Sequence, residues 1–141
     1  MIQRDFIMRM TEMLAKALAK ILLLKENKEY DKALNEIDIT GKELLGDYYQ
    51  IIKNLSDTDL VKWLSSGGYN DSEKCILLSK LLMAEGEVFE LMGENRRGFI
   101  RYLQSLNLLN EAVAQDDKIK SEENLEMMKY LMNKTVNGRT K

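Results

Sequence analysis

Three kinds of side chain in this sequence have chemistry that a functional site could use: a thiol, a group of carboxylates and a cluster of arginines. The thiol is Cys75, which stands beside Lys74 in the first turn of a predicted helix. A helix N-terminus and a nearby cation can both lower the pKa of a thiol. The 141 residues contain no histidine that could act as its base. We therefore favour a half-buried structural cysteine over a reactive or redox-sensing thiol.

The carboxylates Glu85, Glu87 and Glu90 lie close together on one predicted helix, and Glu87 and Glu90 share a face because they are three residues apart. Helical bundles that bind two metal ions combine glutamates with Glu-x-x-His pairs, which a chain without histidine cannot form. A hard-cation site made of carboxylates alone is the alternative. The pattern favours a solvent-exposed helix face, so we expect no metal and no cofactor.

The arginines Arg97 and Arg101 are four residues apart near the start of another predicted helix, so they lie on one side of it. Together they could bind a carboxylate or a phosphate through bidentate hydrogen bonds. We favour the alternative that they pair with Glu90 and Glu94. Nucleic-acid binding needs a wider basic surface with stacking aromatic residues, and a net charge of -2 does not supply one. No nucleic-acid partner is expected.

Helices are the elements that must position these side chains. The sequence has no proline and only 8 glycines, its apolar residues recur at spacings of three and four, and no segment alternates with a period of two. Long helices are predicted over 2–25, 28–46, 71–92, 95–113 and 121–136, with shorter ones over 48–53 and 57–65. Short connections make successive helices antiparallel. We predict one all-α domain of helical hairpins over 1–136, followed by a frayed tail at 137–141.

Local signals predict where several helices begin and end. Gly46 and Gly93 are expected to stop helices, because glycine adopts a left-handed backbone without steric cost. Ser56 resembles an N-cap, and Asn70 with Glu73 has the spacing of a capping box. Gly41, inside a predicted helix, costs roughly 1 kcal/mol relative to alanine and suggests a bend or a close helix contact.

The hairpin over 79–110 carries a repeat-like pattern. Gly86-x-x-Phe89 is followed by the small residue Gly98, the ring of Tyr102 and the small residue Ser105. This pattern resembles the tetratricopeptide repeat, although the proline that normally ends that repeat is absent. It predicts that Tyr102 is buried between the two helices, next to Gly86 or Gly98. We favour a right-handed array of tetratricopeptide-like hairpins over an irregular helical bundle.

The opening Met1-Ile2-Gln3-Arg4-Asp5-Phe6-Ile7-Met8-Arg9 and the later Tyr30-x-x-Ala33-Leu34-x-x-Ile37-Asp38 are similar to a bacterial family of uncharacterised proteins with tetratricopeptide-like folds. The resemblance implies a small, cytosolic, all-helical protein. It carries over no catalytic residue.

A non-enzymatic interaction module is the function that these observations favour. Stacked hairpins form a concave groove that can hold a peptide or a partner helix. Lys80, Met83 and Glu87 are the groove-facing candidates, on the first helix of the second hairpin. The alternative is a small-ligand or metal-binding bundle, or an enzyme, with a site of carboxylates or of Arg97 and Arg101. A cytoplasmic location is expected, and no run of 18 apolar residues predicts a membrane span.

Self-association is a further expectation. Leu22-Leu23-Leu24 is a solid apolar run, and three consecutive helical residues point in directions about 100° apart. One neighbouring helix cannot cover all three. Either the last helix folds back over this surface or a second chain does, and we expect a homodimer.

Overall fold

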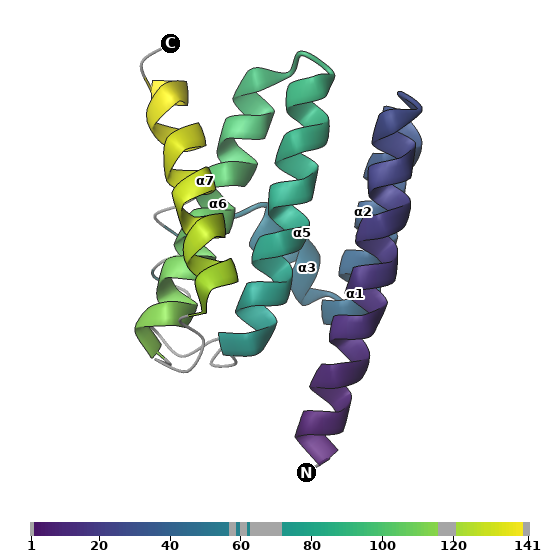
Figure 1. Ribbon diagram of the computed structural model, residues 1–141, viewed down its shortest axis with the longest axis vertical. Coiled ribbons are helices and arrows are strands. Elements are labelled where there is room, and N and C mark those ends of the chain that lie inside the picture. The colour runs from purple at the N-terminus through teal and green to yellow at the C-terminus, as the bar shows by residue number, and fades with distance from the viewer. Residues whose placement is uncertain (1, 57–58, 60–61, 63–71, 116–120, 140–141) are drawn as a thin grey trace.

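The computed structural model describes residues 2–56, 59, 62, 72–115 and 121–139. These residues form helices and their connections and contain no strand, as the sequence predicts. The helices are α1 (Ile2–Glu26), α2 (Tyr30–Leu45), α3 (Tyr48–Lys53), α5 (Ser72–Leu91), α6 (Asn95–Gln115) and α7 (Glu122–Arg139). Figure 1 shows α1 and α2 side by side, with α5, α6 and α7 grouped next to them.

The helix bounds differ slightly from the predicted ones. The helix predicted over 95–113 continues to Gln115, and the helix predicted over 121–136 continues to Arg139. Most of the short helix predicted over 57–65, and Asn70 of the predicted capping box, lie outside the described residues. The amide of Asp59 nevertheless donates to the hydroxyl oxygen of Ser56 at 3.1 Å, which is the bond expected of an N-cap serine.

Glycine ends two helices in the predicted way. Gly46 has a φ of 60° and its amide donates to the carbonyl of Lys42 at 2.8 Å, while Gly93 has a φ of 81°. Gly41 instead marks a close contact, because a Cβ atom there would lie 2.5 Å from the ring of Tyr49. The missing side chain thus lets α3 pack directly on α2.

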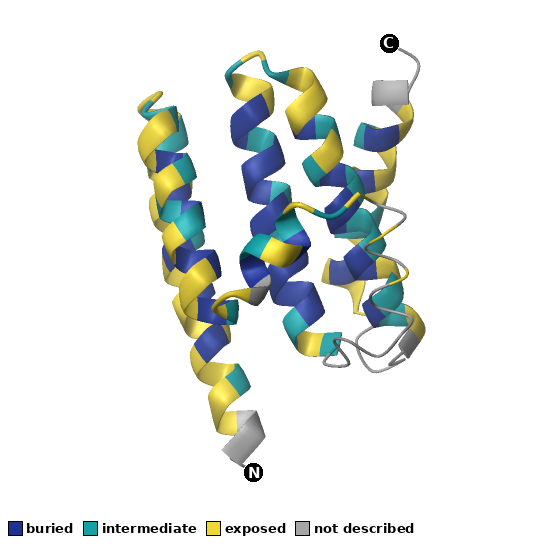
Figure 2. Cartoon of the chain, turned by 180° about the vertical axis from the view of Figure 1, so that it is seen from behind, coloured by how far each residue is buried: buried dark blue, intermediate teal, exposed yellow. Residues whose placement is uncertain are grey.

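The helices run in two directions. Followed along the colour scale of Figure 1, α1, α5 and α7 point the same way, and α2 and α6 point the opposite way. α5 is the central helix: it packs most extensively on α6 and also touches α1 and α2, whereas α7 packs on α6. Figure 2 shows buried residues along most of α5, so this helix forms the middle of the core.

Small residues bring α5 and α6 close together. A Cβ atom on Gly98 would lie 2.9 Å from the carbonyl oxygen of Gly86, and one on Gly86 would lie 2.9 Å from the ring of Tyr102. Tyr102 is only 2% exposed, so its predicted burial beside these glycines is confirmed. Further along, the hydroxyls of Ser79 and Ser105 each donate to the other's backbone carbonyl at 2.7 Å. The contact between α5 and α6, which we call the seam, therefore combines close approach of the two backbones with polar groups that all have hydrogen-bond partners.

Candidate functional site

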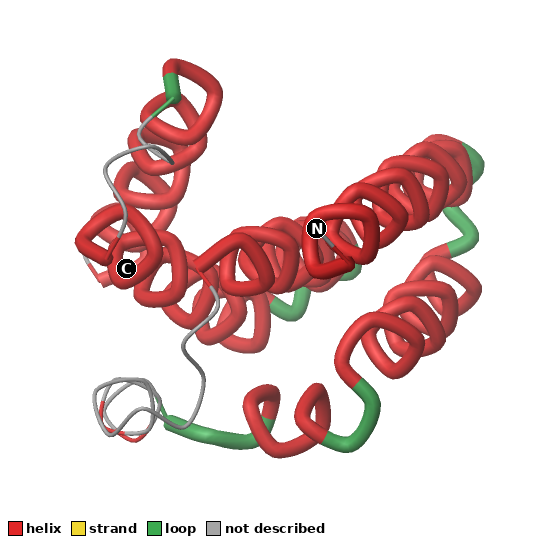
Figure 3. The backbone as a smooth tube through the Cα atoms, turned by 90° about the horizontal axis from the view of Figure 1, so that it is seen from below, coloured by secondary structure: helices red, strands yellow, loops and turns green. Residues whose placement is uncertain are grey.

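An open groove of about 680 Å3 runs along α5, with α1 and α7 as its walls. In the end view of Figure 3, α7 lies to the left and α1 to the right of the centre of the molecule. The groove is lined by residues of three helices: Thr11, Leu14, Ala15, Leu18, Ile21, Leu22 and Lys25 of α1, Leu77, Lys80, Met83, Ala84 and Glu87 of α5, and Glu123, Glu126, Met127 and Tyr130 of α7.

The three groove candidates from the sequence all lie in this groove. Lys80, Met83 and Glu87 follow one another at spacings of three and four along α5, so they share one face of the helix. The adjoining face, with Gly86 and Ser79, is occupied by α6. The seam with α6 therefore decides which residues of α5 face the groove.

Polar contacts close one end of the groove. The ammonium of Lys25 lies 3.4 Å from a carboxylate oxygen of Glu87, and the hydroxyl of Tyr130 donates to the other oxygen at 2.8 Å. Burial and this hydrogen bond raise the pKa of Tyr130 above its ordinary value, so the hydroxyl remains a donor. Glu87 thereby connects α1, α5 and α7.

The other end of the groove carries an exposed ion pair. Lys80 Nζ lies 3.3 Å from an oxygen of Glu123, whose side chain is 78% exposed. The stretch between the two ends is lined mainly by apolar side chains, including Leu14, Leu18 and Met83. The groove is thus an apolar trough with polar ends.

α7 is tied to the rest of the molecule next to this site. The rings of Tyr102 and Tyr130 meet edge to face with centroids 6.3 Å apart. Tyr102 donates to Glu90 at 3.1 Å, and Lys134 lies 2.6 Å from the same carboxylate oxygen. Glu90 was expected to pair with an arginine, and it pairs instead with Lys134 of α7.

The arginine pair does not form one anion site. Arg97 is 65% exposed, pairs with Glu94 at 3.4 Å as expected, and stacks over the ring of Phe89 at 5.3 Å. Arg101 turns into the protein, where its Nε contacts Glu85 and its Nη1 donates to the carbonyl of Lys53 at 3.0 Å. Neither arginine lines the groove.

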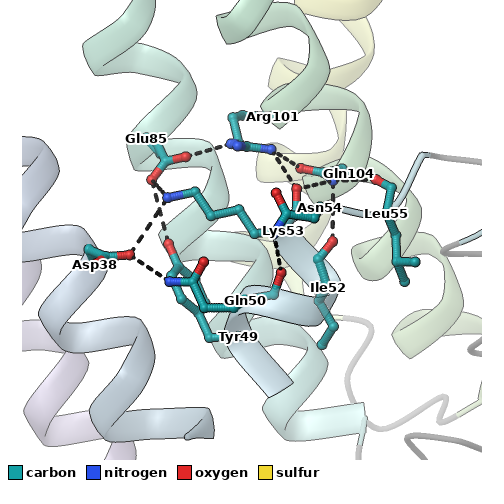
Figure 4. Close-up of polar contacts among 10 residues, drawn as sticks. All are labelled: Asp38, Tyr49, Gln50, Ile52, Lys53, Asn54, Leu55, Glu85, Arg101 and Gln104. Atoms are coloured by element: carbon teal, nitrogen blue, oxygen red, sulfur yellow. Dashed lines mark hydrogen bonds and ion pairs between the residues drawn. The ribbon is translucent and has the colours of Figure 1, made fainter. Parts of the chain in front are cut away.

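Glu85 is the centre of a buried polar junction formed with Asp38, Tyr49, Lys53, Arg101 and Gln104 (Figure 4). Its side chain is 1% exposed and lies 3.1 Å from Lys53 Nζ. Tyr49 donates to it at 3.5 Å. The expectation that Glu85 lies on a solvent-exposed face is wrong, because α3 folds over this side of α5. The positive charges of Lys53 and Arg101 compensate the buried carboxylate of Glu85. We therefore interpret the junction as structural.

Gln104 ties the end of α3 to α6. Its amide nitrogen donates to the carbonyls of Ile52, Lys53 and Leu55 at 3.3, 3.1 and 2.8 Å. The last carbonyls of a helix have no partner within the helix, and here a single glutamine side chain supplies one. No local sequence signal predicts this contact, because the partners are about fifty residues apart in the chain.

Asp38 completes the junction at its edge. It lies 3.2 Å from Lys42, 3.7 Å from Lys53, and accepts a hydrogen bond from Gln50 at 3.1 Å. Burial works to raise its pKa, but the hydrogen bond from Lys42 and the charge of Lys53 outweigh burial, so the pKa of Asp38 lies below its ordinary value.

Cys75 is more deeply buried than expected, at 1% exposure within the core. Among the described side chains, no group of three or more His, Cys, Asp or Glu is arranged to hold a metal ion. None of the helices in the described part of the chain combines the length and apolarity needed to cross a bilayer.

The walls of the groove were not predicted. Leu14, Leu18 and Leu22 of α1 line the groove. The run Leu22-Leu23-Leu24 was the available signal, because it makes the apolar stripe of α1 too wide for one neighbour. Leu22 and Leu23 are 51% and 57% exposed, so α7 does not cover them.

No curated protein and no solved structure matches the chain significantly. One family model does match, over residues 1–101. That range holds α1 to α5 and the first turns of α6, and α7, one wall of the groove, lies beyond it. With more than two thirds of its sequence matched, the chain belongs to DUF6483, a family of unknown function.

Proposed function

We propose that this protein is a non-enzymatic interaction module that binds a peptide or a helix of a partner protein in the groove between α1, α5 and α7. The observation that carries the proposal is the groove itself, an open apolar trough with Lys80, Met83 and Glu87 on its floor. Amphipathic helices are commonly bound in such troughs through their apolar face.

The length of the groove supports a macromolecular occupant. On α1 the lining residues run from Thr11 to Lys25, about 21 Å at 1.5 Å per residue. On α5 they run from Leu77 to Glu87, about 15 Å by the same rise. A helix of ten to fourteen residues, about the average length in globular proteins, fills a trough of this length.

As part of the same proposal, we infer that the helices form a tetratricopeptide-like array. In such arrays the first helices of successive hairpins line the concave surface, and here α1, α5 and α7 run in one direction along the groove. Gly86, Gly98 and Tyr102 pack at the α5–α6 seam as the repeat pattern requires. We also propose a bacterial, cytoplasmic protein. The sequence has a single cysteine and therefore no disulfide within the chain, which supports a reducing compartment.

A small-molecule site is the second candidate. The groove volume of about 680 Å3 falls in the range of ligand pockets, roughly 300–1,000 Å3. The polar group Lys25, Glu87 and Tyr130 at one end could orient such a ligand. The open, elongated form of the trough favours the interaction module.

A blocking substitution tests the proposal. Ala15 is exposed and lines the groove, whereas Ala19, one turn further along α1, is exposed and does not line it. Peptides of about 16 residues, long enough for four helical turns, are selected from a random displayed library against the wild-type protein. We expect Ala15→Trp to weaken the selected peptides at least about tenfold, a loss of 1.4 kcal/mol, and Ala19→Trp to leave their affinity unchanged.

Two results would contradict the interaction module. Selected peptides that bind the wild type and Ala15→Trp equally well would place peptide binding outside the groove. A metabolite retained stoichiometrically by the wild type in native mass spectrometry, and lost from Ala15→Trp, would favour the small-molecule site.

A further inference from the structure

The two walls of the groove are attached to the rest of the molecule in different ways. α1 packs on both α2 and α5 and buries four apolar side chains, those of Met10, Leu14, Ala17 and Ile21. α7 packs on α6, and Leu131 is the only buried apolar residue among its described side chains, while Met127 and Met128 are half-buried. Burial of apolar surface is the main force that holds helices together in water. α7 is therefore held less firmly than α1.

Polar contacts connect α7 to α5 at three levels. They join Glu123 to Lys80 at 3.3 Å, Tyr130 to Glu87 at 2.8 Å, and Lys134 to Glu90 at 2.6 Å. The residues of α7 are spaced by seven and four along the chain and those of α5 by seven and three, so each set occupies one side of its helix. Because α5 and α7 point the same way (Figure 1), the contacts follow in the same order along both helices. We name these three contacts the polar ladder.

The polar ladder is accessible to water. The side chain of Glu123 is 78% exposed and that of Glu90 is 42% exposed. Exposed ion pairs contribute little to stability, and dissolved salt screens them. The attachment of α7 to α5 should therefore weaken as the salt concentration rises, whereas the attachment of α1 rests on buried apolar side chains and should not.

We propose that α7 is a displaceable wall of the groove, which undocks as one unit while α1, α2, α5 and α6 stay folded, and that the polar ladder makes this undocking sensitive to salt. Elements with few buried apolar contacts commonly open locally without global unfolding. Undocking removes Glu126, Met127 and Tyr130 from the groove lining. It also separates the ring of Tyr102 from that of Tyr130, which it meets edge to face. The docking of α7 thus sets the width of the groove, whatever the groove binds.

Undocked α7 should lose its helical hydrogen bonds. It has 18 residues, and isolated helices shorter than about 12–15 residues are marginal in water even when they are rich in alanine. α7 is little longer and contains Asn124, Asn133 and Thr135, which have lower helix propensities than alanine. The exchange of its backbone amide hydrogens with water therefore reports undocking.

Hydrogen exchange followed by mass spectrometry tests the proposal on the full chain. At about 0.05 M salt we expect the amides over 125–134 in α7 to exchange at least about tenfold faster than those over 76–89 in α5. An increase to about 0.5 M salt should accelerate exchange in α7 at least about threefold. It should leave the exchange of 76–89 in α5 and of 10–21 in α1 unchanged.

Charge-matched variants test the role of the polar ladder. Glu123→Gln with Lys134→Gln removes one charge from each of two contacts. Glu122→Gln with Lys129→Gln also removes one glutamate of the first turn and one lysine of α7, at exposed positions outside the ladder. We expect the ladder variant to accelerate exchange in α7 at least about fivefold at low salt and to lose most of its salt dependence. The control variant should match the wild type within about twofold.

The contrary results are distinct. Exchange in α7 as slow as in α5 would overturn the displaceable wall. Exchange over 98–112 in α6 or 10–21 in α1 that is as fast as in α7 would show that a larger part of the molecule opens, and would overturn undocking of α7 as one unit. Fast exchange in α7 that changes neither with salt nor in the ladder variant would overturn the polar ladder as its control. None of these measurements needs an occupant of the groove, so the library selection judges the proposed function separately.

Discussion

The two faces of α5 differ in what they leave accessible. Towards α6 and α3, the helix presents Ser79, Glu85 and Gly86, which are buried and have their polar groups satisfied or their backbone in close contact. Towards the groove, it presents Lys80, Met83 and Glu87, which are half-buried and reach open space. One helix thus provides both the centre of the core and the floor of the candidate site.

This difference predicts which positions of α5 can be substituted without unfolding the protein. The seam depends on contacts that a substitution cannot replace, because backbone and small side chains meet there directly. The groove face depends on flexible side chains at an open surface, where most substitutions have small effects on stability. Residues of the groove face are therefore available for binding, and those of the seam are not.

The largest expected contrast is between two glutamates of α5. Glu85→Ala should lower the free energy of unfolding by roughly 3–5 kcal/mol, because it leaves Lys53 and Arg101 without their buried partner. Glu87→Ala should cost less than about 1 kcal/mol, because its pair with Lys25 is partly exposed. Urea unfolding followed by circular dichroism measures both. Equal losses would show that the two faces do not differ as described.

Removal of the ring that fills the seam should have the next largest effect. Tyr102→Ala should cost on the order of 3 kcal/mol, since it empties a fully buried volume beside Gly86. Tyr102→Phe keeps the ring, loses the hydrogen bonding of the hydroxyl, including the bond to Glu90, and should cost about 1 kcal/mol. Urea unfolding of both variants separates packing from hydrogen bonding. A loss below about 0.5 kcal/mol for Tyr102→Ala would contradict the packing at the seam.

A single methyl group tests the close approach of α5 and α6. Gly98→Ala places a Cβ atom 2.9 Å from the backbone carbonyl of Gly86, so the helices must separate. We expect a loss of about 1–3 kcal/mol, despite the higher helix propensity of alanine. Asn110→Ala, at an exposed position of the same helix, should stay within about 0.5 kcal/mol of the wild type. Thermal unfolding compares them, and a stabilised Gly98→Ala would refute the contact.

The low pKa of Asp38 predicts that its substitution has a smaller effect on stability and that this effect depends on pH. Its pKa in the folded protein lies below the ordinary value of 3.8, so its contribution to stability is present above that value and is lost as pH falls through the folded pKa. Asp38→Asn should therefore cost less than about 1 kcal/mol at neutral pH. The difference from wild type should vanish below the folded pKa. Urea midpoints compared at about pH 7 and at successively lower pH below 3.8 measure this; a difference that stays constant as pH falls would contradict it.

A substitution among the exposed leucines of α1 should change self-association with almost no effect on folding. Because Leu22 and Leu23 remain more than half exposed, we expect a dimer at micromolar concentration. Leu23→Lys should weaken it and change the free energy of unfolding by less than about 0.5 kcal/mol. Sedimentation equilibrium decides between the two states. A single 16.4 kDa species over a hundredfold dilution of the wild type would reject the dimer.

Much of the secondary structure and one tertiary contact could be predicted from the sequence. The helices follow from apolar spacing, and the stops at Gly46 and Gly93 follow from a backbone conformation that glycine favours. The burial of Tyr102 beside Gly86 could also be predicted. These features depend on residues close together in the chain or on one hairpin, so the pattern itself contains the information.

Only the tertiary structure decided the roles of the charged residues and the walls of the groove. Two residues apart, Glu85 and Glu87 lie on different sides of α5. The sequence does not say which side is covered, and in the structure the first is buried and the second faces the groove. Their difference depends on Lys53 and Tyr130, which are 32 or more residues away in the chain and come close only when α3 and α7 pack against α5 and α6. Local spacing determines which side of a helix a residue occupies. What covers that side depends on long-range packing, which no local pattern encodes.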